Sequence, residues 1–179
     1  MAAGVAPEPG NGPGSILGDE TLPVLDLRQQ PAIGSFVAAH WRRYQLAGLS
    51  LPGANLERLF VESSNLTDAD LADCRLVRAH LVDSLLVGAH LAGADLTQAV
   101  LVNVDLRGTD LTEVRMSGSV LVYCDLRGAR LDRADLRQTV WSHTDLRGVD
   151  LSASLLDGAR GDFFWDDATR WPASVDPQR

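Results

Sequence analysis

Leucine recurs every five residues through most of this chain. Steps of five from Leu46 to Leu156 give twenty-three positions, and only Val61, Met116 and Trp141 among them are not leucine. Five residues turn about 500° on an α-helix, so the leucines would leave any single face. On a flat strand they would alternate between the two faces. The backbone must therefore turn a corner every five residues, with each leucine pointing at a common axis.

Small residues mark a second inward position, two residues before each leucine. Ala69, Cys74 and Ser84 are examples, and Val104 and Val114 are among the few larger ones. Close-packed interiors leave no voids, so we expect these small side chains to fill the gaps between the leucines.

A longer period of twenty residues fixes the number of corners. DLRGTDL begins at Asp105, DLRGARL at Asp125 and DLRGVDL at Asp145. Four five-residue sides then close one coil, and the glycines of these repeats stand where a turn is needed. Coils stack at the strand spacing of about 4.8 Å, so just under six coils make a tower roughly 27 Å tall.

The repeated motif resembles A(D/N)LXX, the signature of the pentapeptide-repeat family. It reads ANLER, SNLTD, ADLAD, AHLVD, ADLTQ, TDLTE, ARLDR and ADLRQ here, and it covers about residues 44–160. The resemblance implies an all-β solenoid, a right-handed quadrilateral β-helix. Characterised members of the family include quinolone-resistance proteins that bind DNA gyrase.

The segments before the repeats are predicted to be a tail and a cap. Residues 1–21 are rich in Gly, Pro and Ala, which favours disorder. Residues 22–43 are expected to form an N-terminal cap, with a short strand at 22–27 (LPVLDL) and a short helix over 35–44 that begins at Ser35. Repeat arrays need such caps over their ends. The residues expected to cover the open end are Phe36, Ala39, Trp41 and Tyr44.

The segment after the repeats, residues 161–179, is rich in aromatic residues. We favour the interpretation that they close the C-terminal end of the leucine core. The alternative is a homodimer contact, as in some quinolone-resistance members of the family. These aromatic residues are Phe163, Phe164, Trp165 and Trp171.

No catalytic constellation is evident, so we predict a protein that is not an enzyme and that holds no metal and no cofactor. His80 and His90 fall on opposite sides, and His143 falls three coils from His80, which is not metal-ligand geometry. Cys74 and Cys124 both occupy the small inward position, too far apart for a disulfide.

Charge and hydropathy narrow the expected partners. The formal net charge is −8, and a direct nucleic-acid partner needs a basic surface instead. The first residues lack the basic start and apolar stretch of an export signal, and no apolar run is long enough to span a membrane. We therefore predict a cytoplasmic protein that does not contact membranes.

The outward residues differ between the four sides. The side with the DLRG repeats carries alternating Asp and Arg, which we interpret as a surface for solubility and pairing between coils. Another side is the most acidic, although Arg130 and Arg133 interrupt it. Its acidic residues are Asp70, Asp73, Asp110, Glu113, Asp132 and Asp150.

The fourth side carries apolar residues where the others carry charges, and a contiguous exposed apolar strip usually marks an interface. Residues 22–27 of the same chain, a second subunit or another partner are the alternatives for what covers it. We call this set the valine strip: Phe60, Val82, Val100, Val102, Val120, Val122 and Val140.

The sequence predicts two alternative functions. The first is a rigid protein-interaction scaffold whose contact surface is the valine strip. The second, implied by the resemblance, is an acidic mimic of DNA that binds DNA gyrase and protects it against quinolone-type inhibitors. The positions that are often Phe in those family members are almost all Leu here, which favours the scaffold.

Overall fold

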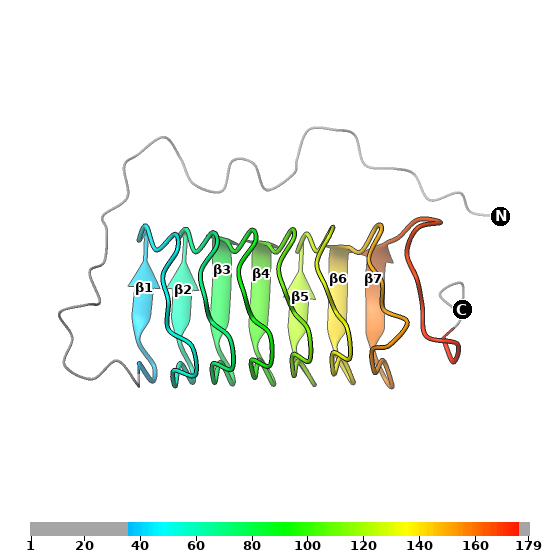
Figure 1. Ribbon diagram of the computed structural model, residues 1–179, viewed down its shortest axis with the longest axis horizontal. Coiled ribbons are helices and arrows are strands. Elements are labelled where there is room, and N and C mark those ends of the chain that lie inside the picture. Colours follow the sequence, from blue (N-terminus) through cyan, green and yellow to red (C-terminus); the bar gives the residue numbers. More distant parts are fainter. Residues whose placement is uncertain (1–35, 176–179) are drawn as a thin grey trace.

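The computed structural model describes residues 36–175 and shows a tower of stacked coils (Figure 1). Within the described residues, seven strands form one parallel sheet in the order β1 to β7. They are β1 (His40–Arg42), β2 (Phe60–Glu62), β3 (His80–Leu85), β4 (Val100–Asp105), β5 (Val120–Val122), β6 (Val140–Asp145) and β7 (Arg160–Phe164). Strand partners lie twenty residues apart, as Val100 and Val120 do, and bridges on the other sides keep that spacing. The predicted solenoid of about six four-sided coils is confirmed.

Residues in the left-handed backbone conformation, with positive φ, form the corners of the coils. The Leu46 carbonyl accepts a hydrogen bond from the Leu49 amide at 3.0 Å, and Gly48 between them has a φ of 67°. This is a type II turn, and it recurs along the chain. Fifteen of the described non-glycine residues also have positive φ, at a cost of about 1 kcal/mol or more each. The contacts between stacked coils outweigh that cost.

The leucine columns and the small inward residues form the core. Leu106 is 1 % exposed, and Ala69 and Cys74 are fully buried. Where the small residue is polar, its hydroxyl bonds to the backbone of the preceding coil: Thr109 Oγ1 donates to the Leu86 carbonyl at 3.1 Å. The interior is therefore packed layer on layer.

The predicted helix over 35–44 is wrong for the residues that the structure describes. His40–Arg42 forms β1 and pairs in parallel with β2, and Trp41 lies opposite Val61. Trp41 is only 3 % exposed because it occupies a central core position. The five-residue spacing therefore extends to residues 36 and 41, and the solenoid begins before residue 44. The predictions for residues 1–35 fall outside the described residues.

Two of the four aromatic residues predicted to close the core, Phe163 and Trp171, pack on its end, whereas Trp165 is 36 % exposed. The ring of Phe163 lies 5.2 Å from that of Trp141 and 5.3 Å from that of Trp171. Strand β7 also belongs to the sheet, so the solenoid continues past the predicted boundary at residue 160.

Gly161 is expected to be essential to this cap. Its φ is 131°, and an added Cβ would lie 1.8 Å from the Trp141 carbonyl oxygen. Gly161→Ala should therefore separate β7 from β6, red-shift the tryptophan emission and remove hydrogen-exchange protection from residues 160–171.

Gly158→Ala is the matched control for that substitution. Gly158 also has a positive φ, of 73°, but its added Cβ would meet no atom closer than 3.4 Å. We expect a cost of only about 1 kcal/mol there. Equal losses of cap protection in the two variants would contradict the role assigned to Gly161.

Candidate protein-interaction surface

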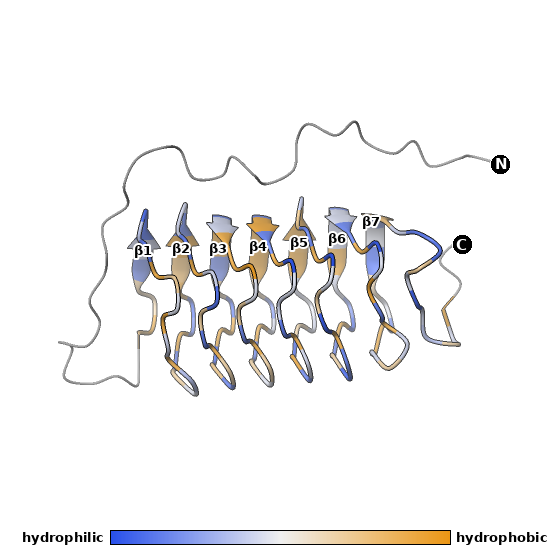
Figure 2. Cartoon of the chain, turned by 45° about the horizontal axis from the view of Figure 1, so that its top comes forward, coloured by the Kyte–Doolittle hydropathy of each residue, from blue (hydrophilic) through white to orange (hydrophobic). Residues whose placement is uncertain are grey.

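The structure brings the valine strip together on strands β2 to β6. In β5 the central Leu121 is buried, whereas Val120 and Val122 beside it are half-buried on the outer face. Val100, Val120 and Val140 are register partners along one column, and Val82, Val102 and Val122 form a second. The apolar colour of β4 and β5 stands out in Figure 2. Six valines are therefore contiguous on one regular sheet.

Aromatic rings extend the strip at one end of a column and border it at one corner. His40, Phe60 and His80 stack in one column, with centroids 5.4 and 6.2 Å apart. Tyr123, which sequence reasoning missed, is 57 % exposed and stacks on His143 at 4.9 Å. Its position two residues after a central leucine, where a corner turns outward, was the signal that could have identified it.

The predicted acidic side is largely paired with arginine. The Glu113 carboxylate accepts a hydrogen bond from Arg133 Nε at 3.0 Å. Arg130 lies 3.6 Å from Asp110 and 3.7 Å from Asp132.

The remaining acidic residues of this side are less uniform. Asp150 lies 3.5 Å from Arg170 and also accepts hydrogen bonds from the Ser152 hydroxyl and amide, which lower the pKa of Asp150. Asp70 is half-buried and accepts a hydrogen bond from the Ala72 amide, and Asp73 is exposed. Four of the six predicted residues are thus ion-paired, so this side carries less uncompensated charge than the sequence suggested.

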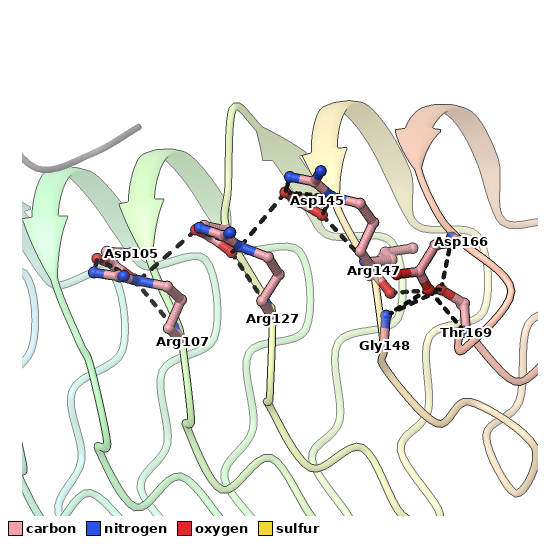
Figure 3. A network of polar contacts seen from close by, with 10 residues as sticks. Asp105, Arg107, Arg127, Asp145, Arg147, Gly148, Asp166 and Thr169 are labelled. Carbon is pink, nitrogen blue, oxygen red and sulfur yellow. Dashed lines mark hydrogen bonds and ion pairs between the residues drawn. The ribbon is translucent and has the colours of Figure 1, made fainter. Parts of the chain in front are cut away.

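The DLRG side is a ladder of ion pairs (Figure 3). Arg107, Arg127 and Arg147 each make a two-pronged contact with the Asp two residues before, and Arg127 Nη2 lies 2.7 Å from Asp125 Oδ2. Arg127 Nε also lies 3.6 Å from Asp145 in the next coil. We call the six residues the Asp–Arg ladder: Asp105, Arg107, Asp125, Arg127, Asp145 and Arg147.

The predicted pairing between coils is present on this side, but burial of the aspartates corrects the other half of the sequence interpretation. The side chains of Asp105 and Asp125 are 1 % and 8 % exposed, so they are not surface charges for solubility. The hydrogen bond to Asp125 raises the pKa of Arg127, which keeps the guanidinium charged. The ladder also links successive coils, because Arg107 lies 3.8 Å from Asp125 and Arg127 lies 3.6 Å from Asp145.

Beyond the last arginine, Asp166 contacts the backbone of Gly148, the residue that follows Arg147. It accepts hydrogen bonds from the Gly148 amide at 3.0 Å and from the Thr169 amide at 3.1 Å. These contacts join the ladder to the C-terminal cap (Figure 3).

The two thiols are expected to be inert in the folded chain. Cys74 and Cys124 are free and buried, and burial raises the pKa of Cys74 to about 11 and that of Cys124 to about 12. Because the thiolate is the reactive form, a disulfide reagent at about pH 8 should not modify the native protein but should titrate both thiols in urea. An exposed thiol made by Ser152→Cys is the positive control; modification of Cys74 at the rate of that thiol would contradict the burial.

Between residues 36 and 175, no group of three His, Cys, Asp or Glu side chains is placed to hold a metal ion. The same residues include no helix long and apolar enough to cross a membrane.

The chain belongs to the pentapeptide-repeat family. The family model for pentapeptide repeats matches residues 64–101, 99–138 and 124–160, with eight copies. These matches span more than half of the chain and lie within the stacked coils described above. None of the curated proteins matches the chain.

Several solved structures are similar. A pentapeptide-repeat protein from the thylakoid lumen of Arabidopsis thaliana is 27 % identical with a TM-score of 0.51, over 52 % of this chain and 66 % of that one. HetL, involved in heterocyst differentiation regulation in Nostoc, is 26 % identical with a TM-score of 0.32, over 79 % of this chain and 69 % of that one. The plasmid-mediated fluoroquinolone resistance protein QnrB1 is 14 % identical with a TM-score of 0.35, over 75 % of this chain and 87 % of that one. The chain thus spans just under two thirds of the Arabidopsis protein.

Proposed function

We propose that this chain is a rigid protein-interaction scaffold and that the valine strip is its contact surface. The observation that carries the proposal is the contrast between the sides. Val100, Val120 and Val140 form an unbroken half-buried column. On the DLRG side and the acidic side, by contrast, the charged residues form ion pairs with one another. Burying such an apolar face against another protein is favourable, and the closed coils already satisfy the backbone beneath it.

The test is a comparison of captured proteins. Immobilised full-length chain and its Val100→Ser/Val120→Ser variant are exposed to a lysate and washed in about 0.5 M NaCl, which screens surface charge. We expect proteins that survive the salt wash on the wild type and are absent from the variant. Asp132→Asn, on the acidic side, is the control and should change nothing. Identical sets of proteins on all three chains, together with a full-length chain that stays monomeric, would refute the proposal.

DNA mimicry with DNA gyrase as the target is the second candidate, favoured by the formal net charge of −8. The arginine pairs of Asp110, Glu113 and Asp132 count against it. A supercoiling assay with and without a fluoroquinolone decides the matter. Inhibition or drug protection that fades as salt is added supports mimicry, because salt screens the charges involved. No effect at high micromolar concentration excludes it.

A further inference from the structure

We propose that the partner of the valine strip is a second copy of this chain, and that two towers pack side by side and parallel on this side. The inference rests on the proposed function, because it takes the same strip as the contact surface. It comes from the two rows of corner residues that border the strip.

Each strand of the strip has one corner residue before it and one after it, all with positive φ. Within one coil the two corner residues are five positions apart. The row before the strands is Arg58, Arg78, Gln98, Gly118 and Gln138, and the row after them is Ser63, Asp83, Asn103, Tyr123 and His143.

A two-fold axis parallel to the tower exchanges these rows between the two copies. Each coil then faces the same coil of the second copy, and the same patch serves both partners. Arg78 faces Asp83 of the second copy, so opposite charges meet twice. Gly118, which has no side chain, faces the exposed ring of Tyr123. The rows therefore contain one facing pair that is complementary in charge and one that is complementary in size.

The same axis brings the valines into contact. The column of Val100 and Val120 faces the column of Val102 and Val122 of the second copy. Packed sheets lie about 10 Å apart, which lets facing side chains interdigitate. The half-buried valines would then be fully covered.

Neighbours along the tower already orient the two charged residues. Arg78 Nε donates a hydrogen bond to Gln98 Oε1 at 2.9 Å, and Asp83 Oδ1 accepts one from Asn103 Nδ2 at 2.8 Å. Each contact uses one atom of the charged group, so the Nη atoms of Arg78 and Oδ2 of Asp83 can meet the second copy. Side chains held in this way lose less entropy on association.

An antiparallel pair is less complementary. A two-fold axis along the strands, centred between β4 and β5, sets β2 opposite β7. Glu62 would then face Asp162, whose side chain is 62 % exposed, and Arg78 would face Gln138. Facing carboxylates repel, which favours the parallel arrangement.

The area of this side is compatible with a specific but small interface. Seven strands at about 4.8 Å make it roughly 29 Å tall, and five residues at about 3.3 Å make it at most about 17 Å wide. Two such faces bury on the order of 1,000 Å², the lower limit for a specific interface. Interfaces of this size are typical of weak, transient association, so we expect a dissociation constant in the micromolar range.

Sedimentation velocity of the full chain, from about 5 to about 500 µM, is the first test. The wild type should shift from monomer to dimer. Val120→Asp should raise the dissociation constant by about 100-fold or more, because it buries an unpaired charge in the contact. A wild type that stays monomeric at the highest concentration, or a Val120→Asp chain that associates normally, overturns the proposal.

A charge exchange tests the parallel arrangement. Arg78→Asp and Asp83→Arg should each weaken the dimer by about 10-fold or more, and the double exchange should restore it to within about 3-fold. The exchange of Glu113 and Arg133 on the acidic side is the control and should leave association unchanged. Failure of the double exchange to restore association overturns the parallel dimer.

The two proposals can fail separately. A monomeric chain that still captures proteins through the strip in the lysate comparison refutes the second copy and leaves the scaffold in place. A monomeric chain whose captured proteins do not depend on the strip refutes both.

Discussion

Leu106→Asp is expected to abolish folding. Leu106 is 1 % exposed and lies midway along the tower, at the centre of a DLRG repeat. Burying a carboxylate without a partner costs several kcal/mol, and the lost leucine packing adds about 2 to 5 kcal/mol. The sum is comparable to the whole stability of an ordinary domain, about 5 to 15 kcal/mol. Far-UV circular dichroism should lose its β signal, and limited proteolysis should find no protected fragment.

Asp110→Ala is the matched control, four residues away on the surface. Asp110 accepts hydrogen bonds from the Thr112 amide and hydroxyl and lies 3.6 Å from Arg130, but its side chain is 25 % exposed. Its loss should cost only about 1 kcal/mol. A soluble Leu106→Asp chain that unfolds cooperatively like the Asp110→Ala chain would contradict the leucine core.

The core could be predicted from the sequence because one spacing accounts for every layer. Residues five apart can all point at one axis only if the chain turns a corner every five residues. The unbroken spacing from Leu46 to Leu156 therefore predicted both which residues point inward and where the chain turns. The twenty-residue period then specified the coil. The packing of Leu106 and the fit of Cys74 beside the leucines follow from these two periods.

The error at residues 35–44 has a physical origin. Val37, Trp41 and Tyr44, spaced at i, i+4 and i+7, are also compatible with one face of a helix, and propensity alone does not separate the two patterns. The stacking of Trp41 on Val61 decides in favour of a strand, and that is a tertiary contact twenty residues away. Local reasoning at the first coil could not include it.

The candidate surface was predictable in part. The valine strip followed from the register, since outward positions on one side recur every twenty residues. The pairing of Asp110 with Arg130 depends on side-chain rotamers, as does that of Glu113 with Arg133, so the charge left on the acidic side was not predictable. The burial of Asp105 was missed for the same reason, because the Arg107 side chain folds back over it.

Arg127→Leu is expected to lower the free energy of unfolding by about 2 to 4 kcal/mol, because it leaves the Asp125 carboxylate, only 8 % exposed, without its two-pronged partner. Arg137→Leu is the matched control, since Arg137 holds Asp135 in the same way but the pair lies on a more open side. Its effect in urea unfolding should be less than half as large. Adding Asp125→Asn to Arg127→Leu should recover part of the loss, because it removes the stranded charge. Equal losses for Arg127→Leu and Arg137→Leu would show that the ladder contributes no more than ordinary surface ion pairs.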